Sequence, residues 1–251
     1  MRYKALLCIT LLSHLALPAQ ATLQDSIKKI KPSVVAIGVF SPLASPRVRL
    51  VGTGFVVADG RKIITNYHVI AKAPDVKRNE SYVVLSGQAD NIQIHQITDT
   101  KTQTVHDLAV LTIEAKLPAA TLAGAEFISE GTEIAFTGFP ITAVLGLYPA
   151  THRGIISAVT PIAIPADHSG QLQASALRQL RQPFMVYQLD ATAYPGNSGS
   201  PVFDINSGEV IGVINMVFLK GLKESALTHP SGISYAIPAN FLGELIRQSA
   251  P

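Results

Sequence analysis

Residues 196–201 read GNSGSP, in which a serine stands between two glycines where a turn gives way to a strand. Gly196 lets the backbone bend sharply, so that the N–H groups of Gly196 and Ser198 can point to one place. Two converging amide donors are what an oxyanion hole requires when a carbonyl carbon becomes tetrahedral. A simple β-turn with a capping serine explains the same pattern equally well, so the motif needs partners elsewhere in the chain.

Two polar clusters upstream supply such partners. The stretch TNYHV (residues 65–69) ends a strand-like run and carries His68, and the stretch HDLAVL (residues 106–111) places Asp107 just before a strand. Together with Ser198 they provide a nucleophile, a base and an orienting carboxylate, because a serine hydroxyl is a poor nucleophile without a base in hydrogen-bond reach. The order His, Asp, Ser, with gaps of 39 and 91 residues, is that of chymotrypsin and not of subtilisin or the α/β-hydrolases.

His106 is the neighbour of Asp107 and therefore a second candidate for the base. Adjacent side chains on one strand point to opposite faces, so we expect that His106 does not share the carboxylate of Asp107. The remaining histidines are scattered and form no H-E-x-x-H pair. The sequence therefore predicts no metal site and no cofactor.

The first 21 residues have the pattern of an export signal. A short basic stretch precedes the apolar run Ala5–Leu17, and the small residues Ala19 and Ala21 follow it. This pattern predicts a signal peptide over residues 1–21, with cleavage before Thr22. The apolar run is shorter than the roughly 20 residues that span a bilayer, so we expect a periplasmic or secreted protein without stable membrane insertion.

Composition excludes several classes of protein. Of the 251 residues, 47% are hydrophobic and 15% charged, which excludes intrinsic disorder as the main state. Without the basic residues Arg2 and Lys4 of the signal, 18 basic residues face 17 acidic ones, so bulk charge does not favour binding to nucleic acid. The single cysteine, Cys8, also lies in the signal, which excludes disulfides and cysteine-based zinc sites from the mature chain.

From Ser33 onward the chain alternates short Val/Ile-rich runs with turn residues, which predicts an all-β protein. The predicted strands cover residues 33–40, 54–57, 62–65, 82–85, 91–97, 109–113, 134–137 and 210–218. The pair Asp59-Gly60 indicates a tight two-residue hairpin turn, and residues 206–208 indicate a slightly longer one.

Helices are expected only at the edges of this β region. Residues 23–30 show helical spacing, with Asp25 or Ser26 as the cap, and residues 241–246 form a second helical stripe. Residues 161–183 read as a long loop with a short helix at 174–182, and residues 115–126 as the boundary between two β units.

The sequence resembles the trypsin-like serine peptidases of chymotrypsin fold, most closely the HtrA/Deg branch. The likeness runs from about Ile27 to Arg247 and rests on seven ordered matches besides the general pattern. They are PSVVAI (32–37), GTGFV (52–56), the His68 and Asp107 motifs, RGIIS (153–157), the Ser198 motif and GISYAIP (232–238). The resemblance implies two six-stranded antiparallel β-barrels: residues 22–122, which carry His and Asp, and residues 123–251, which carry Ser and a terminal helix.

The same resemblance implies roles for individual residues. Ser198 is expected to be the acyl nucleophile, His68 the general base and then acid, and Asp107 the group that orients His68. The oxyanion hole is expected at Gly196, Asn197 and Ser198, with the N–H groups of Gly196 and Ser198 as donors. This implies an exported serine endopeptidase that acts on polypeptides, in protein quality control or the degradation of unfolded proteins. The alternative is a catalytically silent binding or chaperone-like module of the same fold.

In trypsin-like peptidases the residue six positions before the nucleophile lies at the floor of the substrate pocket, so the resemblance implies a substrate-binding role for Thr192. The strand Asn215-Met216-Val217 is expected to bind the substrate as well. Because Thr192 has no carboxylate, an Arg or Lys side chain would lack a partner at the pocket floor, although Asp190 lies only two residues away. An extended substrate would pair with the strand edge, whose apolar residues favour a small or medium apolar side chain.

Two features separate the chain from the usual family pattern. Ser200 stands where the family usually has a second glycine, and the chain stops about a dozen residues past Pro238, so we expect no PDZ module. HtrA relatives often form trimers through the segment before the first barrel. Here that segment is only Thr22 to about Lys31, and the sequence does not decide whether the chain forms a homo-trimer.

Overall fold

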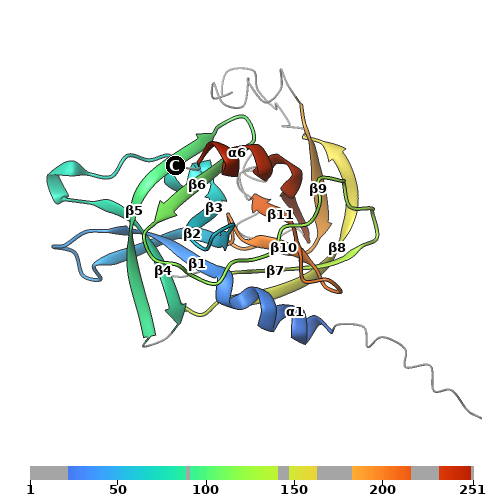
Figure 1. The fold of residues 1–251 in the computed structure, drawn as a ribbon, viewed down its shortest axis with the longest axis horizontal. Coiled ribbons are helices and arrows are strands. Elements are labelled where there is room, and N and C mark those ends of the chain that lie inside the picture. The colour runs from blue at the N-terminus through green and yellow to red at the C-terminus, as the bar shows by residue number, and fades with distance from the viewer. Residues whose placement is uncertain (1–21, 89–90, 141–146, 163–182, 216–231, 250–251) are drawn as a thin grey trace, which may run out of the picture.

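The computed structural model describes residues 22–88, 91–140, 147–162, 183–215 and 232–249 of the chain. In this part the strands form two closed antiparallel barrels of six strands each, with the orders β1-β2-β3-β6-β5-β4 and β7-β8-β9-β12-β11-β10. The barrels repeat one topology and pack against each other (Figure 1). The prediction of an all-β, two-barrel chymotrypsin-like fold is confirmed.

The elements have the following bounds. The first barrel comprises β1 (Val34–Phe40), β2 (Val48–Val57), β3 (Lys62–Asn66), β4 (Ser81–Gln88), β5 (Asn91–Gln103) and β6 (Leu108–Ile113). The second comprises β7 (Glu133–Gly138), β8 (Ala150–Pro161), β9 (Met185–Asp190), β10 (Pro201–Asp204), β11 (Val210–Asn215) and β12 (Ile233–Pro238). The helices are α1 (Leu23–Ile30), α2 (Tyr67–Ile70) and α6 (Leu242–Gln248), with short 3₁₀ turns at Lys31–Ser33, Val76–Arg78 and Ala239–Phe241.

Several strands are longer than the apolar runs that predicted them. β5 extends to Gln103 although most of its side chains are exposed. Its backbone pairs with β4 and β6, and this pairing does not require buried side chains. The hairpin after β2 is also wider than predicted. Val57 pairs with Lys62, so the turn has four residues (58–61) rather than the two-residue turn expected from Asp59-Gly60.

An apolar cluster joins the two barrels. Phe55 and Leu108 of the first barrel pack in one cluster with Phe203 and Val213 of the second. The terminal helix α6 adds Leu242 and Leu245 to the same cluster, as the 241–246 stripe predicted. Burial of this apolar area fixes the barrels relative to each other, and therefore fixes any groups that face each other across their junction.

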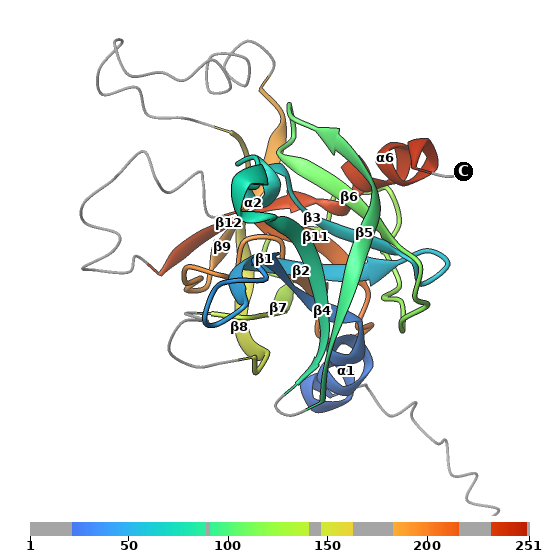
Figure 2. The same ribbon diagram turned by 90° about the vertical axis from the view of Figure 1, so that its left-hand side faces the viewer.

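The N-terminal helix α1 packs against the second barrel, at the turn between β10 and β11 (Figure 2). Ser26 Oγ donates to the Ile205 carbonyl at 2.7 Å, and Lys29 Nζ donates to the Ser207 carbonyl at 2.9 Å. The cap of α1 is Thr22, whose side chain accepts from the Asp25 N–H in a capping box, so the predicted cap at Asp25 or Ser26 is wrong. Asp25 instead supplies the reciprocal carboxylate.

Some expectations lie outside the described residues: the signal over 1–21, the helix at 174–182, and Met216 and Val217. Within the described ranges, no helix is long and apolar enough to cross a membrane.

Candidate active site

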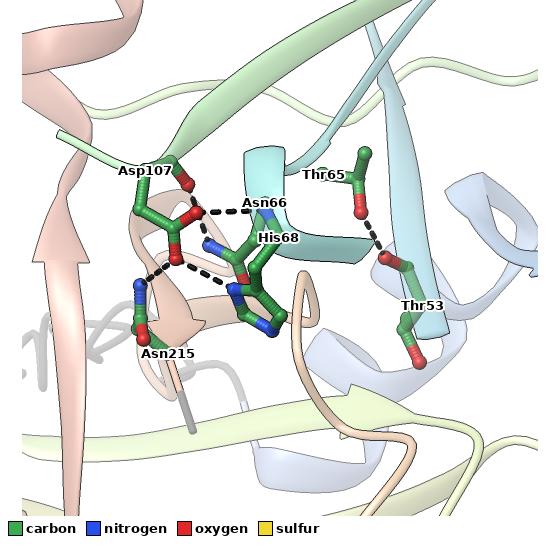
Figure 3. Close-up of polar contacts among 6 residues, drawn as sticks. All are labelled: Thr53, Thr65, Asn66, His68, Asp107 and Asn215. Atoms are coloured by element: carbon green, nitrogen blue, oxygen red, sulfur yellow. Dashed lines mark hydrogen bonds and ion pairs between the residues drawn. The ribbon is translucent and has the colours of Figure 1, made fainter. Parts of the chain in front are cut away.

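His68 and Asp107 meet where two elements of the first barrel end. β3 stops at Asn66 and α2 begins at once, which places His68 on its first turn, while Asp107 lies in the turn before β6. His68 Nδ1 lies 2.6 Å from Asp107 Oδ2, and the backbone N–H of His68 donates to Oδ1 at 2.8 Å (Figure 3). A carboxylate at Nδ1 favours the tautomer that carries its proton there, so Nε2 is left as the basic nitrogen.

Asp107 is held in this position from several sides. Its carbonyl accepts hydrogen bonds from the Tyr67 N–H at 3.0 Å and from Asn66 Nδ2 at 3.2 Å. From the second barrel, Asn215 Nδ2 donates to Asp107 Oδ2 at 2.7 Å. The Asp107 side chain is only 9% exposed. The two hydrogen bonds to the carbonyl hold the backbone of Asp107, and the hydrogen bond from Asn215 orients its carboxylate.

The contact between Asn215 and Asp107 was not expected from the sequence, which assigned Asn215 to substrate binding. Both residues are buried and lie 108 positions apart in the chain. A pattern of a few neighbouring residues cannot predict a contact between two residues so far apart in the chain. The side chain of Asn215 donates a hydrogen bond to the Asp107 carboxylate, so only the backbone of Asn215 is left for the predicted pairing with a substrate.

The reason given for setting His106 aside is wrong, although His68 is the histidine that contacts Asp107. Asp107 lies in a turn, with φ +53°, and not on a strand, so the alternation of strand side chains does not apply. His106 points away because its ring stacks on Phe241, at a centroid distance of 4.2 Å, and meets the edge of Phe184 at 4.6 Å.

Burial lowers the pKa of His106 below its ordinary value, and its Nδ1 has no hydrogen-bond partner among the described residues. Below about pH 6.5 the unfolded chain therefore binds a proton at His106 that the folded chain does not bind, so the stability decreases as the pH is lowered. We expect His106→Phe to flatten the decline of Tm between pH 7 and pH 5, measured by thermal unfolding at half-unit steps. A decline as steep as that of the wild type would contradict this.

The segment with Ser198 is a succession of tight turns. The Asn197 N–H donates to the Tyr194 carbonyl and the Ser200 N–H to the Asn197 carbonyl, both at 2.9 Å. Gly196 has φ +101°, a conformation that favours glycine. The N–H groups of Gly196 and Ser198 donate to no described residue, which leaves them available as the expected oxyanion donors.

Ser198 lies against the first barrel near His68. The Thr53 N–H donates to the Ser198 carbonyl at 2.9 Å. A Cβ on Gly52 would lie 2.8 Å from the methyls of Val69 and 3.3 Å from the Ser198 carbonyl oxygen. Gly52 therefore lies between Val69, the residue after His68, and Ser198. No hydrogen bond joins Ser198 Oγ to His68 within the described residues; such contacts are often loose in unliganded enzymes.

The departure at Ser200 has a structural counterpart. Ser200 is fully buried, and a Cβ on Gly138 would lie only 1.9 Å from its Oγ. The missing side chain at Gly138 therefore provides the space that Ser200 occupies.

Gly199 is required for this packing. It has φ +88°, and a Cβ there would lie 2.0 Å from the Thr53 carbonyl oxygen. We expect Gly199→Ala to lower the free energy of unfolding by at least about 3 kcal/mol, from strain plus overpacking. The matched control is Gly131→Ala, since Gly131 has φ +83° with nothing within 4 Å, and its cost is about 1 kcal/mol. Equal losses in urea unfolding would refute the steric argument.

The expected pocket residues are only partly described. Thr192 is half-buried after β9, in a segment held by Ser234, whose Oγ donates to the Ala191 carbonyl at 2.7 Å and accepts from the Ala193 N–H at 3.0 Å. Among the described residues, no three His, Cys, Asp or Glu side chains gather as metal ligands would.

The model of the trypsin-like peptidase domain matches residues 52–213. A probable periplasmic serine endoprotease, DegP-like, from Halomonas elongata is 31% identical over 192 residues, which cover 76% of this chain and 33% of the relative. Serine protease HTRA1 of Xenopus tropicalis is 30% identical over 231 residues, covering 90% of this chain and 42% of the relative. The chain thus spans less than half the length of either protein.

Solved structures share the fold. The serine endoprotease from Yersinia pestis has a TM-score of 0.61 at 24% identity, over 90% of this chain and 66% of that chain. The Rv3671c protease from M. tuberculosis, in its active form, has a TM-score of 0.64 at 20% identity, over 98% of this chain and 96% of that chain.

Proposed function

This chain belongs to the trypsin-like peptidase domain family, and from that premise we propose that it is a serine endopeptidase whose acyl-enzyme forms on Ser198. The observation that carries the proposal is the buried contact of Asp107 with His68, which Asn215 of the other barrel completes. A merely structural histidine needs no carboxylate that is itself held by donors from two barrels.

In the first half of the reaction, Ser198 Oγ attacks the carbonyl carbon of the scissile bond while His68 Nε2 takes the hydroxyl proton. The oxyanion accepts hydrogen bonds from the N–H groups of Gly196 and Ser198, within the hole formed by residues 196–198. Asp107 stabilises the imidazolium that has formed. His68 then gives the proton to the leaving amine nitrogen as the C–N bond breaks.

In the second half, water attacks the acyl carbon and His68 accepts a proton from it. The second tetrahedral intermediate collapses, the ester bond to Ser198 breaks, and the proton returns to Ser198 Oγ. The carboxylic acid product leaves and the site is restored. No cofactor enters either half.

For the substrate, we propose polypeptides with a small or medium apolar side chain before the scissile bond. Thr192, which we expect at the pocket floor, offers no carboxylate to a basic side chain, and we expect Asn215, Met216 and Val217 to pair with an extended substrate. The pattern of residues 1–21 and the DegP-like relative described as periplasmic support an exported enzyme. A role in protein quality control is proposed from the resemblance to the HtrA/Deg branch alone. A homo-trimer stays a prediction.

The test of the proposed function is labelling of the purified protein with a fluorophosphonate probe, together with cleavage of casein. We expect both, and we expect heat-unfolded protein and Ser198→Ala to show neither. A folded wild type that neither labels nor cleaves would overturn the proposal in favour of a catalytically silent binding module.

A further inference from the structure

We propose that Thr53 is a positioning residue, by which the first barrel sets the shape of the oxyanion hole in the second. The inference rests on the proposed function. We call residues 194–199 the nucleophile loop. Thr53 lies on β2, is fully buried, and contacts this loop through both its backbone and its side chain.

Thr53 holds the nucleophile loop at two carbonyls. Its N–H donates to the Ser198 carbonyl at 2.9 Å, and its Oγ1 donates to the Gly196 carbonyl at 2.7 Å. The peptide group that carries the Ser198 N–H lies between these two anchored carbonyls. Its orientation, and with it the aim of an oxyanion donor, therefore depends on Thr53.

The direction of the side-chain hydrogen bond is determined by a third group. The Phe139 N–H donates to Thr53 Oγ1 at 3.0 Å, and Phe139 directly follows β7 of the second barrel. A hydroxyl has one proton, and a carbonyl can only accept, so the proton of Thr53 is committed to Gly196. The hydroxyl thus links the nucleophile loop to the end of β7.

Thr53 is itself anchored within the first barrel. Its carbonyl accepts a hydrogen bond from Thr65 Oγ1 at 2.7 Å (Figure 3). Thr65 precedes Asn66 and His68 on the chain, so the same pair of strands that presents the histidine also carries Thr53. The paired strands β2 and β3 therefore fix the position of the base relative to the oxyanion donors. Catalysis by preorganised dipoles requires such a fixed arrangement.

A second buried threonine offers a matched control. Thr137 on β7 is also fully buried, and its Oγ1 shares a hydrogen bond with Thr151 Oγ1 at 2.8 Å. Thr137→Val therefore removes a buried hydroxyl of the same kind, and the hydrogen bond that it removes leads to Thr151 and not to the nucleophile loop. Any loss that reflects only a weaker fold will appear in this variant too.

The experiment compares Thr53→Val, Thr53→Ser and Thr137→Val in the full chain, with fluorescein-labelled casein as substrate and thermal unfolding as the stability readout. We expect Thr53→Val to lower kcat by about 10–100-fold with KM within about threefold, because the donors are misplaced in the transition state. Thr53→Ser keeps the hydroxyl and stays within about threefold of the wild-type kcat. Thr137→Val keeps kcat even where its Tm falls as far.

Three results would overturn the inference. A kcat for Thr53→Val equal to that of Thr137→Val would show that the hydroxyl does not position the loop. A Thr53→Ser variant as slow as Thr53→Val would show that a hydroxyl at this position is not enough to position it, because serine keeps the hydroxyl. Should Thr53→Val not fold, Thr53→Cys replaces it, since a thiol of similar size is a poor donor. A wild type that fails to label with fluorophosphonate would overturn the proposed function, and the inference with it.

Discussion

Ser198→Ala will lower kcat for casein cleavage by about 10⁵–10⁶-fold and leave the fold intact. The loss is large because the acyl-enzyme route disappears, and only substrate binding and the oxyanion donors remain to accelerate attack by water. The fold survives because backbone hydrogen bonds hold this segment: Thr53 donates to the Ser198 carbonyl at 2.9 Å, and Gly199 donates to the Ile214 carbonyl at 3.0 Å.

The matched control for this variant is Ser200→Ala. Ser200 is buried two positions away, and its Oγ has no partner among the described residues. We expect its removal to leave kcat within about threefold of the wild type, since it makes no contact that the reaction uses. Active-site titration with the fluorophosphonate probe and initial rates on casein decide the matter. Equal losses in the two variants would refute the assignment of the nucleophile.

Asp107→Asn will lower kcat by roughly 10⁴-fold, the second largest effect we expect. In the wild type, Oδ2 receives His68 Nδ1 and Asn215 Nδ2, while Oδ1 accepts the His68 backbone N–H. An amide cannot serve both positions. With its NH₂ toward Nδ1 it forces the wrong tautomer on His68, and with its NH₂ turned the other way it faces the backbone N–H, donor against donor.

The control for the charge change is Asp204→Asn. The Asp204 carboxylate also accepts two backbone hydrogen bonds, from Asn206 at 2.7 Å and Ser207 at 2.9 Å, in the turn after β10. Its amide variant should lose stability without a comparable loss of kcat. Steady-state rates for both variants, each at a temperature where unfolding shows it folded, measure the difference. An Asp107→Asn enzyme within tenfold of the wild type would mean that Asp107 does not set the tautomer of His68.

Local sequence patterns predicted strands only where the side chains are buried and therefore apolar. The Val/Ile runs marked the buried parts of β1, β3 and β6, because a strand that lines a core must be apolar. They did not mark the full length of β2 or β5, whose outer parts are half-buried or exposed. β8, β9, β10 and β12 were not among the predicted strands. RGIIS (153–157) within β8 and GISYAIP (232–238), which contains β12, were noticed only through the family resemblance.

The sequence by itself determined the residue types and their order: His68, Asp107 and Ser198 in the order found in chymotrypsin, amid short strands separated by turns. Such features are local, so a pattern of a few residues can carry them. Only the tertiary structure decided that Asn215 holds Asp107, that Thr53 holds the nucleophile loop, and that His106 stacks among aromatic rings. These contacts join residues far apart in the chain, and their geometry follows from how two barrels pack, which no local pattern encodes.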